Sequence, residues 1–275
     1  MKNWAAIIPL CITIIACAVM GLHGPIMQLA NYHEFADQSM FLGMPHAADV
    51  LSNAGFAVIG VWGWFRLRPM RCHPAIQAGW HGYQLFLVGL ALTAAGSSFY
   101  HLAPDNARLL WDRLPIALAC AGLLAAVRTE NQLLADGKST TAWLGVFAVG
   151  SVAWWYVTDQ RGQGDLRPYL LLQILPLVLI PLWQAIYRAN RADRLWFGLA
   201  LLLYVFAKGA ELRDHELLTA VGWVSGHTLK HLLATAAAAL LVGRLACRVR
   251  VPASADLPIP MVCVQGMRTN GLLVK

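Results

Sequence analysis

Apolar residues fill most of the chain in long runs that short polar segments interrupt. A membrane-spanning helix needs about 20 mostly apolar residues. Eight stretches approach this length, near residues 4–22, 48–66, 82–103, 107–127, 141–158, 168–187, 195–212 and 224–246. The pattern predicts an all-α integral membrane protein: a seven-helix transmembrane bundle preceded by one N-terminal helix.

The N-terminal stretch has a second interpretation. Lys2 precedes the apolar run, and the small residues Ala16, Cys17 and Ala18 end it, as in a secretory signal peptide. We therefore expect three parts: a signal-anchor or signal peptide over 1–22, a membrane domain over 23–250, and a cytoplasmic tail over 251–275.

Composition supports a membrane protein. Of the 275 residues, 58% are hydrophobic and 13% are charged, whereas soluble domains average about 45–50% apolar and about 25% charged. The six cysteines include no CxxC pair, which argues against a cysteine-bound zinc site.

The basic residues predict the orientation of the chain, because they concentrate in cytoplasmic loops. With the N-terminus inside, fourteen of the 21 lysines and arginines lie on the inner side and four in outer loops. The remaining three, Arg113, Lys208 and Lys230, fall within or at the edge of spans. This distribution explains the formal charge of +7 without nucleic acid as a partner.

Ionisable residues within membrane spans are costly and often functional, and here they gather in two places. His101 ends the third predicted span, and His227 and His231 begin the eighth. Residues four apart share one helix face, so the last two imidazoles can reach one ion. The predicted topology brings Ser97, His101, Asp112, His227 and His231 to one depth on the outer side. We therefore predict a metal site formed by the three histidines.

Three neutral nitrogen ligands with an open fourth position are typical of catalytic zinc. Asp112 could accept a proton from the attacking water or orient it, and Ser97 could donate a hydrogen bond to an oxyanion. Two structural interpretations stay open. Ser97 could be a small residue in a helix–helix contact, and Asp112 could pair with Arg108 or Arg113.

The combination of SxxxH at 97–101, Asp112 and HxxxH at 227–231 resembles the alkaline ceramidase family. That family belongs to a wider group of seven-span membrane hydrolases with the adiponectin-receptor and hemolysin III-like proteins. Shorter matches are ADVLSN at 48–53, DRLP at 112–115 and SGHTLKHL at 225–232, the last resembling the bacterial branch. The resemblance covers about residues 30–250.

The resemblance implies a zinc ion held by His101, His227 and His231, with Asp112 assisting the attacking water and Ser97 stabilising the oxyanion. The implied reaction is hydrolysis of the amide bond of a ceramide-like lipid, which releases a fatty acid and a sphingoid amine. We expect a bacterial inner membrane protein with its site near the periplasmic side, and the bilayer and a lipid substrate as partners. Another lipid amide or ester is the alternative substrate.

Family members of this kind can also carry Ca²⁺ near the N-terminal end, on acidic residues. Here His46 stands where a family glutamate is expected, and Glu34, Asp37 and Asp49 are the candidate ligands. The interpretation we favour for these acids is a solvated acidic loop.

The segment ELRDHE at 211–216 is expected either to contact the metal histidines or to be a solvated helix end. Lys230 is expected on a different face from the histidines, paired with Glu211 or Asp214. Other functions remain open: a receptor-like protein with a structural zinc, a haem-binding electron carrier, or a transporter.

Overall fold

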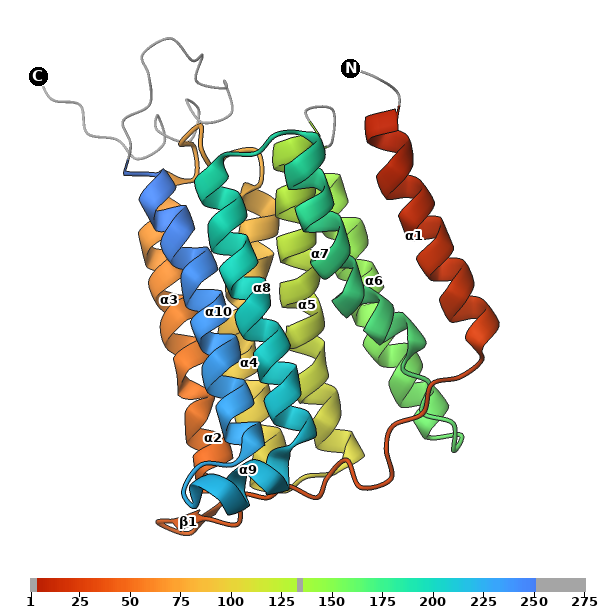
Figure 1. The fold of residues 1–275 in the computed structure, drawn as a ribbon, viewed down its shortest axis with the longest axis vertical. Coiled ribbons are helices and arrows are strands. Elements are labelled where there is room, and N and C mark those ends of the chain that lie inside the picture. Colours follow the sequence, from red (N-terminus) through yellow and green to blue (C-terminus); the bar gives the residue numbers. More distant parts are fainter. Residues whose placement is uncertain (1–3, 133–135, 251–275) are drawn as a thin grey trace, which may run out of the picture.

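The computed structural model describes residues 4–132 and 136–250, and the predicted tail 251–275 lies outside the described residues. It confirms the all-α membrane bundle. Seven helical segments are long and apolar enough to cross a membrane, and a shorter apolar helix precedes them. The chain is therefore a multi-pass membrane protein. Figure 1 shows the long helices side by side, with the first and last described residues, 4 and 250, toward the same end.

The elements follow one another closely along the chain. They are α1 (Trp4–His23), β1 (Met40–Phe41), β2 (Met44–Pro45), α2 (Ala47–Ser52), α3 (Ala54–Leu67), the 3-10 helix η1 (Arg68–Met70), α4 (Trp80–Leu102), α5 (Asn106–Asn131), α6 (Gly137–Asp159), α7 (Arg167–Ile186), α8 (Arg191–Leu212), α9 (Asp214–Val221) and α10 (Gly226–Arg248). The two short strands form an antiparallel pair.

The second membrane segment is broken near its start, where the sequence predicted one helix over 48–66. Helix α2 ends at Ser52, and α3 begins at Ala54. At the break, the buried Asn53 side chain donates a hydrogen bond of 2.9 Å to the carbonyl oxygen of Asp49. The break directs α2 and its polar residues toward the interior of the bundle.

Helices α4 and α5 approach each other closely at one end of the bundle. Pro115 has no N–H to donate, which leaves the carbonyl of Trp111, one turn earlier, without its usual intrahelical partner. That carbonyl oxygen lies against Gly96, at a position that a Cβ atom would occupy. Only glycine allows this approach, which brings Ser97 and Asp112 face to face.

Helix α10 is fixed at its first turn. The Ser225 hydroxyl accepts a hydrogen bond of 2.9 Å from the backbone N–H of Thr228 and caps the helix. Gly226 lies against the backbone of α8 at Ala210 and leaves no room for a side chain. The first turn of α10, which carries His227 and His231, therefore has a defined position next to α8.

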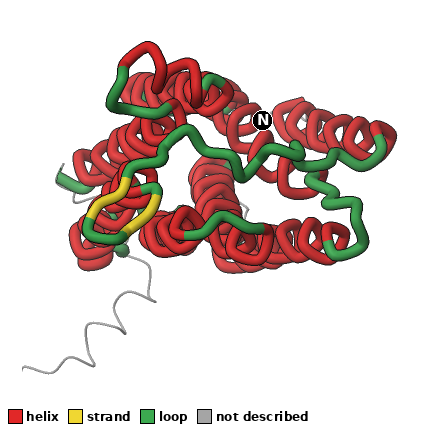
Figure 2. The backbone as a smooth tube through the Cα atoms, turned by 90° about the horizontal axis from the view of Figure 1, so that it is seen from below, coloured by secondary structure: helices red, strands yellow, loops and turns green. Residues whose placement is uncertain are grey.

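The segment after α1 crosses this end of the bundle before α2 begins, as Figures 1 and 2 show. Asp165 anchors its start. The carboxylate accepts hydrogen bonds from the backbone N–H of Ile26 at 3.3 Å, from Trp154 Nε1 at 2.9 Å and from the Arg167 guanidinium. Arg167 also donates to the carbonyl oxygen of Met20 in α1. One ion pair thus connects α1, α6 and α7.

Asp165→Asn tests this anchor through the pH dependence of stability. Partial burial would raise the pKa of Asp165, but the hydrogen bonds from Arg167, Trp154 and Ile26 outweigh it and lower the pKa to about 2. A carboxyl whose pKa is lower in the folded state stabilises the protein above its unfolded pKa, and this contribution is lost as the pH falls toward 2. We expect the variant to melt a few degrees below wild type at pH 7, with the difference shrinking between pH 4 and 2. Thermal unfolding in detergent measures it, and an equal difference at both pH values would contradict the assignment.

Candidate metal centre

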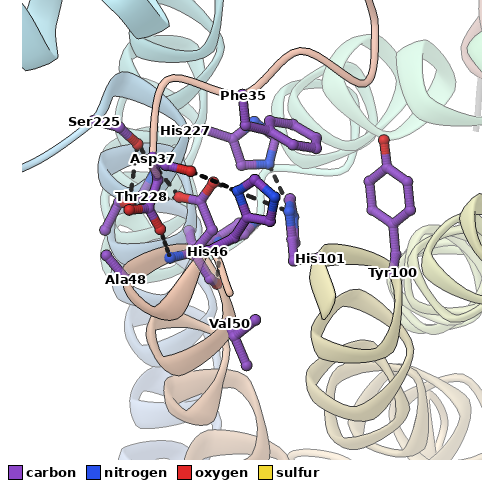
Figure 3. Close-up of polar contacts among 12 residues, drawn as sticks. Phe35, Asp37, His46, Ala48, Val50, Tyr100, His101, Ser225, His227 and Thr228 are labelled. Atoms are coloured by element: carbon purple, nitrogen blue, oxygen red, sulfur yellow. Dashed lines mark hydrogen bonds and ion pairs between the residues drawn. The ribbon is translucent and has the colours of Figure 1, made fainter. Parts of the chain in front are cut away.

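Three buried histidines from two helices meet where α4 ends and α10 begins. The Nε2 atoms of His101 and His227 lie 3.2 Å apart. The ring of His231 lies 5.1 Å from that of His101 and 4.8 Å from that of His227, measured between centroids. Figure 3 shows a nitrogen of His227 directed toward His101, with the Phe35 ring next to His227. The three predicted ligands thus come together.

The chemistry of this cluster fits a metal ion. One ligand nitrogen from each histidine can be chosen so that all three lie within 4.8 Å of one another, and all three residues are buried. Tetrahedral zinc with Zn–N bonds of 2.0–2.1 Å holds its nitrogens about 3.4 Å apart, close to the 3.2 Å between His101 and His227. Apolar packing does not account for three buried imidazole nitrogens that lie this close together. The three histidines, which we call the metal triad, could therefore bind a metal ion.

Asp49 on α2 lies next to both helices that carry the histidines. It is fully buried, and its Oδ1 accepts a hydrogen bond of 2.5 Å from the Thr228 hydroxyl of α10. Its Oδ2 lies 4.0 Å from Nδ1 of His101. Neither of these last two atoms has a hydrogen-bond partner among the described residues. A carboxylate behind a ligating imidazole orients the ring and strengthens it as a ligand.

The tautomer of His231 is fixed by the same residue. Its Nδ1 lies 3.2 Å from the backbone carbonyl oxygen of Asp49, which can only accept, so Nδ1 carries the proton. The Ser52 hydroxyl lies 2.8 Å from the same nitrogen. The lone pair of His231 is therefore on Nε2, where it is available to a metal ion.

The acidic segment before α2 forms part of the site, so the expectation of a solvated loop was wrong for Asp37 and Asp49, which are both buried. Burial would raise the pKa of Asp37, but hydrogen bonds from the Ser39 side chain and from the backbone of Asp49 and Ser39 lower it. Only Glu34 of the three calcium candidates is exposed. Among the described residues, no metal-binding group includes any of these acids.

Phe35 closes the outer face of the histidine cluster. Its ring centroid lies 4.6 Å from that of His101 and 4.5 Å from that of His227. Asp214, at the start of α9, holds the segment in place: its Oδ2 accepts from the backbone N–H of Ala36 at 2.9 Å, and its Oδ1 accepts from that of His227 at 2.7 Å. This side of the site is covered by protein.

The inner side opens into a cavity of about 340 Å³ within the bundle. Its polar lining includes Ser97, Asp112, Glu211, Lys230 and His231, all at the metal end. Most of the remaining lining is apolar and comes from α4, α5, α7, α8 and α10, with further polar side chains such as Thr93, Gln173 and Tyr204 among it. Ligand sites commonly have this size and this combination of few polar groups and a large apolar wall.

Asp112 and Ser97 lie where the sequence predicted, in the wall of this cavity. The Ser97 side chain lies next to the Asp112 carboxyl group, and both residues are buried. Arg108 instead pairs with Asp105 at 3.9 Å. Arg113 donates to Gln28 at 2.7 Å and stacks on Trp155 at 4.0 Å. The described contacts therefore do not include a bridge from Asp112 to either arginine, while packing remains a role for Ser97.

The ELRDHE segment contacts the centre through two different acids. Asp214 accepts from the backbone of His227, as described above, and Glu211 accepts a hydrogen bond of 3.0 Å from Lys230. The pairing of Lys230 with Glu211 is as expected. The expectation that Lys230 lies on a different face from the histidines was wrong, because its Nζ lies 2.8 Å from Nε2 of His227.

A larger cavity of about 880 Å³ lies at the opposite end of the bundle, between α5, α7, α8 and α10. Its charged residues are paired: Arg248 donates to both oxygens of Glu130, and Arg244 donates to Asp193 at 2.7 Å. These charged residues therefore satisfy one another.

A scan against protein-family models and a search of the curated proteins found no match for this chain. The resemblance to the alkaline ceramidase family therefore rests on its short motifs alone. Sequence reasoning missed the role of Asp49 as the partner of His101 and His231. A signal was present in the sequence: the segment ADVLSN begins where the chain becomes apolar again, and Asp49 is the buried acid within it.

Replacing His227 or His231 with alanine tests the centre. Each change removes one of three nitrogen ligands, so we expect bound metal, measured by mass spectrometry of purified protein, to fall from one equivalent to below one tenth. Helical content, measured by circular dichroism, should persist. His81→Ala, which changes an exposed histidine on α4, is the matched control and should retain its metal. Full metal content in either ligand variant would exclude the triad.

Asp49→Asn tests the residue behind the ligands. The amide keeps an acceptor for Thr228 but loses the negative charge that faces His101. Outer-shell partners of metal ligands typically contribute 10–100-fold in affinity, so we expect a loss of this size in competition with a chelator. Asp193→Asn, at the opposite end of the bundle, should leave the affinity unchanged. Equal metal affinity in the two variants would argue against a role for Asp49.

Proposed function

We propose that this protein is a zinc-dependent membrane hydrolase that cleaves the amide bond of a ceramide-like lipid. The observation that carries the proposal is the cavity, in which His231 of the metal triad shares one wall with Asp112 and Ser97. A metal ligand, a candidate base and a hydroxyl thus line one space large enough for a substrate.

A lipid fits the surroundings of the site. The cavity lies inside a bundle of apolar helices, and apolar residues such as Phe86, Leu90, Leu123 and Phe197 line it away from the metal. The ionisable residues Asp112, Glu211, Lys230 and His231 line it beside the metal triad. An amphiphile with a reactive polar group and an apolar chain matches this division, and the released products would be a fatty acid and a sphingoid amine.

The roles of the residues follow from their chemistry. Zinc, when bound by three histidines, supplies a Lewis acid that polarises a carbonyl group and activates water. Asp112 has one buried oxygen without a partner among the described residues, and this oxygen can accept the proton of an attacking water. Ser97 holds the other side of this carboxyl group in place.

A receptor-like protein with a structural zinc is less well supported. Structural zinc sites are closed by four protein ligands, whereas the metal-binding group among the described residues has three and does not include Asp112. A haem carrier is also disfavoured, because imidazole rings with centroids 4.7–5.1 Å apart leave no space for a macrocycle between them.

The location of the site in the membrane follows from the charges. The inner-side arginines of the charge analysis, such as Arg66, Arg128 and Arg244, lie at the end of the bundle opposite the histidines. The positive-inside rule thus supports a site near the periplasmic side of a bacterial inner membrane.

Asp112→Asn separates catalysis from metal binding. Removing a general base typically lowers the rate by 10²–10⁴-fold, so we expect kcat for a short-chain ceramide to fall by at least about 100-fold with the zinc content unchanged. Released fatty acid is measured by mass spectrometry, and an N-acyl amide and an ester of the same chain length test the alternative substrates. Glu216→Gln, at an exposed position, is the control. Undiminished hydrolysis by metal-free wild-type protein would overturn the proposal.

A further inference from the structure

Lys230 is a cation inside the cavity, and its surroundings point to a ligand oxygen. Its Nζ lies 2.8 Å from Nε2 of His227 and 3.0 Å from Oε1 of Glu211. The other oxygen of Glu211 accepts from Lys208 at 2.7 Å. All three members of this cluster, which we call the lysine–glutamate triad, line the cavity.

The lysine–glutamate triad has an excess positive charge. One carboxylate between two ammonium groups leaves a net charge of +1, and the side chains of Lys230 and Glu211 are only 18% and 19% exposed. A partly buried cation is costly unless an anion or a hydrogen-bond acceptor balances it. The Lys208 side chain is 47% exposed and can also be solvated, whereas Lys230 faces the cavity, where the oxygen of a ligand could be a further acceptor for its ammonium group.

Lys230 lies next to a metal ligand, which places its positive charge beside the metal centre. Nε2 of His227 has one lone pair, which can accept from Lys230 or bind a metal ion, but cannot do both. If a metal ion were bound to that nitrogen, Glu211 would still accept a hydrogen bond from Lys230. The other N–H groups of the Lys230 ammonium could then donate to a ligand in the cavity. Two cationic centres side by side favour an anionic oxygen between them.

Ser97 is less suited to this role than the sequence suggested. Its hydroxyl lies next to the carboxyl group of Asp112, which offers its proton an acceptor within the protein. Lys230, in contrast, is a charged donor, and hydrogen bonds from charged donors are about twice as strong as neutral ones.

We propose that Lys230 is the residue that binds the substrate carbonyl oxygen as negative charge develops on it, and that Glu211 positions Lys230. This inference rests on the proposed hydrolase function. When the oxygen of water adds to the carbonyl carbon, the carbonyl oxygen becomes an oxyanion beside the ammonium. The C–N bond then breaks, the protons of the water pass to the amine and the medium, and a carboxylate remains whose oxygen faces Lys230.

Replacing Lys230 with methionine removes the charge and keeps the length of the side chain. Loss of an oxyanion donor typically lowers kcat by 10²–10³-fold. An interaction that forms only in the transition state lowers kcat and kcat/KM equally, so we expect KM for a short-chain ceramide to stay nearly constant. Lys230→Arg should recover part of the rate, and Glu211→Gln should lose less than Lys230→Met. Lys138→Met, an exposed lysine on α6, is the control for loss of a positive charge.

A binding measurement tests Lys230 without turnover. Dodecanoate has the carboxylate of the product, and dodecanol has the same chain without a charge. In zinc-loaded protein, Lys230→Met should weaken dodecanoate by about tenfold or more, as for the loss of one charged hydrogen bond, and leave dodecanol and the zinc content unchanged. Lys230→Gln gives the same comparison if the methionine variant does not fold.

The outcomes separate this inference from the proposed function. Equal weakening of dodecanoate and dodecanol, or a normal kcat in Lys230→Met, would overturn the role of Lys230 while leaving a zinc hydrolase intact. If the wild-type protein hydrolyses no lipid amide, the proposed function fails, and the assignment of Lys230 to a substrate oxyanion fails with it. The dodecanoate comparison would then show whether Lys230 still binds carboxylates.

Discussion

The buried carboxyl group of Asp49 is the interaction on which the rest of the metal end depends. Its carboxylate accepts a hydrogen bond from the Thr228 hydroxyl and lies 4.0 Å from Nδ1 of His101. Its backbone carbonyl oxygen accepts hydrogen bonds from His231 and from Asn53. One residue of a six-residue helix therefore connects α4, α10 and the break between α2 and α3. Because apolar surroundings supply no water to replace these bonds, the positions of His101, His231 and Thr228 depend on the same buried residue.

The fold could be predicted from the sequence because membrane helices have a simple signal. Seven spans are visible as apolar runs, and each expected boundary lies within a few residues of the observed helix. The break at Asn53 could not be predicted in this way, since the residues on both sides are apolar enough for one continuous helix. Its cause is a tertiary one: Asp49 and Ser52 turn inward to contact His231.

The ligands were predictable for a different reason. Two histidines one helical turn apart and a third at the matching end of an earlier span are brought together by topology alone. The surroundings of these ligands are not encoded so directly. Phe35 and Asp37 belong to a segment without a hydrophobic period, and their burial depends on the hydrogen bonds that Asp214 makes with Ala36 and His227. The expectation that Lys230 lies on another face was wrong because residues three apart are also neighbours on a helix surface, and Lys230 follows His227 by three residues.

The arrangement of open and closed sides determines what can reach the histidines. Phe35 covers the face that leads out of the bundle, and the polar residues Asp112, Lys230 and Glu211 line the face that leads inward. A water-soluble ligand would have to displace the covering segment, which Asp214 holds through the backbone N–H of Ala36 while it also accepts from the backbone N–H of His227 on α10. A lipid in the apolar part of the cavity reaches the polar end without that step. The direction of access therefore favours a membrane-borne substrate independently of the motifs that suggested one.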